Sequence, residues 1–78
     1  MKILNVDDNA GSRYAKSRTL QRAGFTVCEA ASGEEALCLV ETEQPDLVLL
    51  DVKLPDINGF EVCRRIKDNP ATATVTVV

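Results

Sequence analysis

Short apolar runs alternate along the chain with stretches in which apolar residues recur at helical spacing. Four segments are predicted to be strands: Lys2–Val6, Thr26–Ala30, Leu47–Leu50 and Thr74–Val78. Helices are predicted between them, over residues 10–23, from Ser32 to the helix-stopping Pro45, and over Gly59–Asp68. Strands that alternate with helices indicate right-handed βαβ units, and hence an α/β fold with a parallel sheet.

The apolar stripe of each helical segment predicts which face packs against the sheet. The stripe expected in residues 10–23 is narrow and consists of Ala10, Tyr14, Ser17, Leu20 and Ala23. Basic residues lie mostly off this stripe and predict a solvated face made of Arg13, Lys16, Arg18 and Arg22. The second helix is expected to bury Ala36, Leu37 and Val40, and the third Phe60, Cys63 and Ile66.

The segment Leu47–Leu50 is the centre of the predicted fold. Its four consecutive apolar residues do not alternate with polar ones, which favours a strand buried on both faces. Asp51 follows directly, at the predicted carboxyl end of this strand. Because open α/β sheets bind ligands beyond the carboxyl ends of their strands, Asp51 is a candidate chemical group.

A pair of adjacent acids, Asp7 and Asp8, follows the first predicted strand. They could form a capped, solvated turn, or both could face a divalent cation such as Mg²⁺, which takes carboxylate, carbonyl and water oxygens. If the third strand lies beside the first and the second lies outside it, both acids converge with Asp51 where the winding reverses. Three such carboxylates repel one another unless a cation neutralises them. A carboxylate screened by a cation can attack phosphorus and hold an acyl phosphate.

Composition and charge narrow the range of functions. The net charge of −3 argues against direct nucleic-acid binding, and no apolar run approaches the length of a membrane span. The chain has no histidine, and Cys28, Cys38 and Cys63 lack metal-ligand spacing, so a zinc site is not expected. The cysteines are predicted to be buried or half-buried in a reducing compartment, which favours a cytoplasmic location.

The chain resembles the receiver domains of response regulators. The residues that carry the resemblance are Val6-Asp7-Asp8-Asn9, Leu49-Leu50-Asp51, Leu54-Pro55 and Asn58-Gly59-Phe60-Glu61, with further matches between Ala23 and Leu37. The resemblance implies a doubly wound, flavodoxin-like parallel sheet, a fold for which a receiver protein is the standard example. It also implies that Asp51 accepts a phosphoryl group from a sensor histidine kinase or phosphotransfer domain. Mg²⁺ would be bound by Asp7, Asp8, Asp51 and the backbone carbonyl of Lys53.

The resemblance covers the 78 residues as the N-terminal part of a single receiver domain. The family has a fifth strand and two more helices, with a Ser or Thr after the fourth strand and a Lys after the fifth. Without the fifth strand, Thr74–Val78 would form an exposed apolar edge, which predicts a possible homo-oligomer.

Three functions compete at this point. The first is a phosphoacceptor domain of two-component signal transduction, which is not an enzyme. The second is a protein-interaction module with a receiver fold and no phosphorylation. The third is an enzyme with an aspartyl nucleophile, although such enzymes commonly place a second acid where this chain has Lys53.

Overall fold

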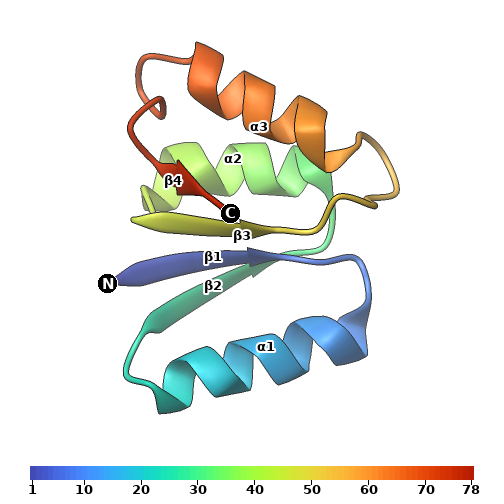
Figure 1. Ribbon diagram of the computed structural model, residues 1–78, viewed down its shortest axis with the longest axis vertical. Coiled ribbons are helices and arrows are strands. Elements are labelled where there is room, and N and C mark those ends of the chain that lie inside the picture. Colours follow the sequence, from blue (N-terminus) through green and yellow to red (C-terminus); the bar gives the residue numbers. More distant parts are fainter.

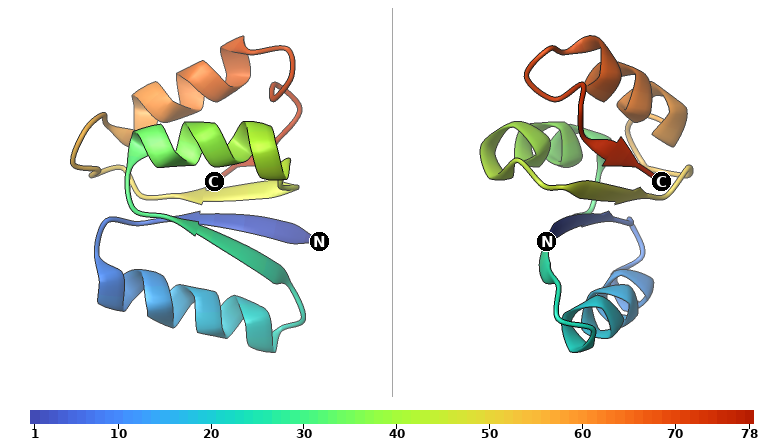
Figure 2. Two further views of the ribbon diagram at one scale, coloured as in Figure 1. Left: turned by 180° about the vertical axis from the view of Figure 1, so that it is seen from behind. Right: turned by 60° about the vertical axis from the view of Figure 1, so that its left-hand side comes forward.

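The computed structural model describes all 78 residues as one parallel sheet with helices on both faces. The strands are β1 (Lys2–Val6), β2 (Thr26–Ala30), β3 (Leu47–Leu50) and β4 (Thr76–Val77). The helices are α1 (Ala10–Arg22), α2 (Gly33–Glu43) and α3 (Gly59–Asp68). Helix α1 covers one face of the sheet, and α2 and α3 cover the other (Figure 1; Figure 2).

The strand order is β2-β1-β3-β4, and every neighbouring pair is parallel. This confirms the predicted α/β class, the doubly wound topology and the edge position of the second strand. The first connection runs from β1 outwards to β2, and the second returns across β1 to β3. The winding therefore reverses between β1 and β3, and their carboxyl ends are adjacent.

The apolar core lies between the sheet and the pair α2 and α3. It consists of Leu4, Val6, Ala30, Ala36, Val40, Val48, Val62 and Ile66, none of which is more than 1% exposed. The opposite face of the sheet is more polar. There the buried Asn5 donates from Nδ2 to the carbonyl oxygen of Arg13 and to Ser17 Oγ, both at 3.0 Å. Helix α1 is thus attached to β1 by hydrogen bonds from the Asn5 amide nitrogen, whereas Asn5 Oδ1 has no partner within the chain.

Each helix is preceded by a residue whose side chain caps its N-terminus. Asn9, Ser32 and Asn58 each accept a hydrogen bond from a backbone N–H three residues ahead, at 2.8, 3.2 and 2.9 Å. The Glu35 side chain reaches back to the N–H of Ala31, one residue before the cap, in a variant of the capping box. Gly24, which follows Ala23, the C-cap residue of α1, has a φ of 96°, the left-handed conformation that glycine commonly adopts after a helix.

Two of the expected helix faces are right only in part: Ile66 and Ser17 are buried as expected, but the aromatic residues of both stripes are exposed. In α3, Phe60 is 74% exposed, whereas Val62 and Ile66 fill the core. A stripe through Val62 and Ile66 has spacing i, i+4, which satisfies helical periodicity as well as the expected i, i+3 stripe does. In α1, Tyr14 is 63% exposed, and Ser17 is the one buried residue of the helix. The hydrogen bond between Asn5 and Ser17, and not the weak apolar stripe, determines which side of α1 faces the sheet.

Other burial predictions succeed or fail with the local packing. Ala36 and Val40 of α2 are buried as expected, and Leu37 is half-buried. Strand β3 has helices on both faces of its sheet, as expected, but only Val48 is fully buried and its other three residues are half-buried. Cys38 is exposed, contrary to the prediction.

The fourth strand is shorter than the predicted Thr74–Val78. Residues 70–74 form turns after α3, in which the Thr72 hydroxyl donates to the Ile66 carbonyl at 2.7 Å and Val75 N–H donates to Thr72. These bonds hold the segment in turns until Thr76, where pairing with Leu47 begins. The strand lies at the edge of the sheet, and association through it stays a prediction.

Candidate metal centre

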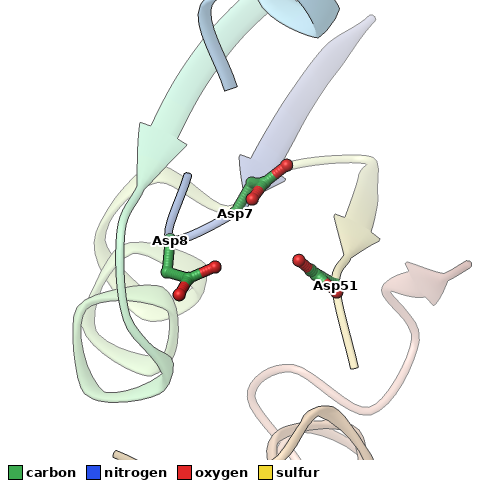
Figure 3. Close-up of side chains that lie close together, drawn as sticks. All are labelled: Asp7, Asp8 and Asp51. Atoms are coloured by element: carbon green, nitrogen blue, oxygen red, sulfur yellow. The ribbon is translucent and has the colours of Figure 1, made fainter. Parts of the chain in front are cut away.

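The carboxyl ends of β1 and β3 bring three acids together. Asp7 N–H donates to the Ala30 carbonyl at 3.0 Å, and Asp51 N–H donates to the Val6 carbonyl at 3.1 Å, so the sheet fixes both backbones. Figure 3 shows the side chains of Asp7, Asp8 and Asp51 gathered around one space. One carboxylate oxygen from each acid lies within 4.8 Å of the others. The convergence expected from the order of the strands is therefore present.

Asp7 is the most constrained of the three acids. Its side chain is only 3% exposed; Oδ1 accepts the N–H of Asn9 and Oδ2 accepts the ammonium group of Lys16, each at 3.0 Å. Burial raises the pKa of the Asp7 carboxyl, but these hydrogen bonds and the charge of Lys16 outweigh it and lower the pKa to about 2. Asp7 is therefore a carboxylate at neutral pH, in the form that can ligate a cation.

The other two acids are more accessible. Asp8 is exposed and Asp51 is half-buried. Asp51 Oδ1 accepts the N–H of Lys53 at 3.2 Å, which turns the chain directly after β3 and leaves the carboxylate facing Asp7 and Asp8. The three acids thus combine one buried anchor with two groups that an incoming molecule can reach.

The chemistry of this donor set fits a hard divalent cation. All three side chains offer oxygen, with no nitrogen or sulfur ligand nearby, and Mg²⁺ and Ca²⁺ prefer oxygen. Mg²⁺ characteristically keeps several waters and uses few carboxylates, so the exposed rim at Asp8 also suits it.

The loop after β3 is held in place from two sides. Gly59, the first residue of α3, donates its N–H to the Val52 carbonyl at 2.8 Å, and a Cβ there would lie 2.7 Å from the Asp51 carbonyl oxygen. Asp56 accepts the N–H groups of Gly33 and Glu34 at the start of α2, both at 2.8 Å. These backbone hydrogen bonds lower the pKa of Asp56, because they favour its charged form. The loop that carries Lys53 is thereby fixed to the N-terminal ends of two helices.

Two basic residues at the site were assigned to a solvated face by the sequence, and that assignment is wrong for them. Lys16 forms an ion pair with Asp7, and Arg13 Nη1 donates to the Asp7 carbonyl at 2.8 Å. Arg18 and Arg22 are exposed, as predicted. The i, i+3 spacing of Arg13 and Lys16 was the available signal, since it puts both on one face of α1.

The fold and the site together define a doubly wound α/β domain with an acidic centre at the carboxyl edge of its sheet. The chain belongs to the response regulator receiver domain family, which it matches over residues 3–78. It is therefore a receiver domain of two-component signal transduction, a family whose domains act as phosphoacceptors in signalling. None of its three helices is long and apolar enough to cross a membrane.

Individual relatives support this assignment. The chain is 49% identical over 65 residues to the transcriptional regulatory protein AfsQ1 of Streptomyces coelicolor, a match that covers 83% of this chain and 29% of that protein. It is 44% identical over 66 residues to the sporulation initiation phosphotransferase F of Bacillus subtilis, covering 85% and 53% of the two. Both relatives are longer than the matched region by a wide margin.

Solved structures agree with the fold. The N-terminal domain of a response regulator receiver protein from Methanoculleus marisnigri superposes with a TM-score of 0.94 at 39% identity, covering 97% of this chain and 62% of that one. The chemotaxis protein CheY4 of Vibrio cholerae gives a TM-score of 0.91 at 34% identity, with 97% and 63% covered. The chain thus spans less than two thirds of these structures.

Proposed function

We propose that Asp51 accepts a phosphoryl group, with Mg²⁺ bound by Asp7, Asp8, Asp51 and the backbone carbonyl of Lys53. The observation that carries this proposal is the half-buried Asp51 carboxylate at the end of β3, within 4.8 Å of two further acids. When bound, Mg²⁺ would neutralise the acids and the phosphoryl oxygens, and so reduce the repulsion between the acceptor and its donor.

Each residue at the site has its own role in this reaction. Asp51 supplies the carboxylate oxygen that bonds to phosphorus as the bond from phosphorus to the donor breaks, which gives an acyl phosphate. Asp7 stays ionised because Asn9 and Lys16 hold it in that form. The loop contacts of Gly59 and Asp56 keep the Asp51 backbone in place. The chain acts as the acceptor and has no turnover of a separate substrate, so we do not class it as an enzyme.

The donor proposed for this reaction is a phosphohistidine on a sensor histidine kinase or a phosphotransfer domain, in the cytoplasm. The family assignment supports this donor. Some relatives are transcriptional regulators, and the acidic net charge of this chain supports the view that these residues do not bind DNA themselves.

The test is labelling by acetyl phosphate, followed by intact mass spectrometry. Mg²⁺-dependent addition of one phosphoryl group is expected in the wild type and in Asp46→Asn, which removes an acid just before β3, at the far end of the strand. Asp51→Asn should show none. Labelling that persists in Asp51→Asn would overturn the assignment of the acceptor. Absence of both labelling and Mg²⁺ binding in the wild type would favour the alternative, a protein-interaction module without phosphorylation.

A further inference from the structure

Lys16 is the only Lys or Arg that forms an ion pair with one of the three acids. Its ammonium group lies 3.0 Å from Asp7 Oδ2, and its side chain is 41% exposed where that of Asp7 is 3% exposed. Lys16 comes from α1, the helix that starts three residues after Asp7. A half-exposed cation therefore contacts the least accessible ligand of the candidate metal centre.

The geometry makes this contact relevant to metal binding. Both carboxylate oxygens of Asp7 already accept a donor, Oδ1 from Asn9 and Oδ2 from Lys16. A divalent cation that uses Asp7 must share one of these oxygens or displace the ammonium group. A bound divalent cation would also lie close to the positive charge of Lys16. Because the Asp7 carboxylate is buried, little water lies around it to screen the repulsion between the two cations.

We infer that Lys16 is an internal competitor of the divalent cation, and that it sets the metal affinity of this receiver domain by occupying Asp7. This inference rests on the proposed function and deepens it, because it assigns a regulatory role at the same site to a residue of α1. Lys16 is a positioning residue in this scheme: it acts on the metal through Asp7. The competing explanation is that Lys16 only orients Asp7, in which case its removal would weaken metal binding.

The experiment measures Mn²⁺ binding, with free Mn²⁺ determined by electron paramagnetic resonance. Lys16→Met keeps the length and apolar stem of the side chain and removes its charge. Arg18→Met is the matched control, because it removes one positive charge from the same helix, where Arg18 stacks on Tyr14 and contacts no acid. Lys16→Arg keeps the charge and tests whether charge is the cause.

Lys16→Met should bind Mn²⁺ about threefold to tenfold more tightly than the wild type, as expected when a partly screened positive charge is removed from beside a divalent cation. Arg18→Met should stay within about twofold of the wild type, since distant exposed charges are screened. Lys16→Arg should also stay within about twofold, because it keeps the positive charge beside Asp7. The rise in melting temperature that Mg²⁺ produces should also be larger in Lys16→Met, because tighter binding stabilises the folded state more.

Equal or weaker Mn²⁺ binding by a folded Lys16→Met would overturn the inference and would leave Lys16 as a residue that orients Asp7. If Lys16→Met fails to fold, Lys16→Gln takes its place under the same criterion. A failure confined to these variants leaves acetyl phosphate labelling of the wild type intact. Absence of Mn²⁺ binding in every variant would overturn the inference as well, and absence of labelling at Asp51 would separately overturn the proposed function.

Discussion

Gly59 offers the sharpest test of how tightly the acidic centre is built. A Cβ at this position would lie 2.7 Å from the Asp51 carbonyl oxygen and 2.8 Å from Val52 Cα, both backbone atoms that no rotamer change can move. Inserting one carbon into such a contact costs about 1–3 kcal/mol. The better helix propensity of alanine offsets only part of this cost, because its advantage of about 1 kcal/mol applies to helix interiors and Gly59 is the first residue of α3. Gly59→Ala should therefore lower the free energy of unfolding by about 1–2 kcal/mol.

Gly11 provides a matched control near the start of another helix. A Cβ there would meet only the side-chain oxygen of Asn9 at 3.4 Å, an ordinary contact. Gly11→Ala should be neutral or raise the free energy of unfolding by about 0.4–1 kcal/mol, because alanine reduces the entropy of the unfolded chain. Urea unfolding followed by circular dichroism gives both values, provided that the m-values match the wild type.

Gly59→Ala should also disturb the candidate metal centre. To make room for the new carbon, the backbone of Asp51 must shift, and its carboxylate shifts relative to Asp7 and Asp8. We therefore expect weaker Mn²⁺ binding in Gly59→Ala and unchanged binding in Gly11→Ala. A Gly59→Ala protein with wild-type stability and wild-type Mn²⁺ affinity would show that the segment after β3 is pliable, and the argument from close contact would fail.

Two further predictions concern acid stability and the packing of α3. The pKa of Asp7, about 2 in the folded protein, lies below the roughly 3.9 of a free aspartate. The contribution of the Asp7 carboxylate to the free energy of unfolding is thus complete above about pH 4 and disappears as the pH falls towards 2. Urea midpoints measured across this pH range should therefore fall less in Asp7→Asn than in the wild type. In α3, Val62→Ala should cost about 2 kcal/mol by opening the core, whereas Phe60→Ala should change the free energy of unfolding by less than about 0.5 kcal/mol. The reverse order in urea unfolding would show that Phe60 packs inward.

The sequence predicted the sheet and the acids well because both depend on local signals. An apolar run that ends in a single acid marks Asp51, and strands that alternate with helical segments indicate a parallel sheet of right-handed βαβ units. The order of the strands entered as an assumption, which the structure confirms. The contacts between helices and strands were harder to predict from the sequence. Phe60 and Val62 both fit helical spacing, and only the position of α3 over the sheet decides between them. Likewise, four basic residues on α1 have similar chemistry, and only the way α1 packs on β1 brings Lys16 to Asp7.

The acids of the candidate metal centre and the side chains that contact them come from different parts of the fold. The acids stand directly after strands, where hydrogen bonds of the sheet hold the N–H groups of Asp7 and Asp51. Other contacts to this region come from side chains that cross between elements: Lys16 reaches Asp7 from α1, and Asp56 ties the loop after Asp51 to the start of α2. A change of charge at Asp51 would act first on these crossing contacts, because each involves a charged, partly exposed group: an ion pair at Lys16, and hydrogen bonds from backbone N–H groups at Asp56. The sheet can then stay rigid while α1 and the loop respond, which is the arrangement a signalling domain needs if phosphorylation is to alter its surface without unfolding its core.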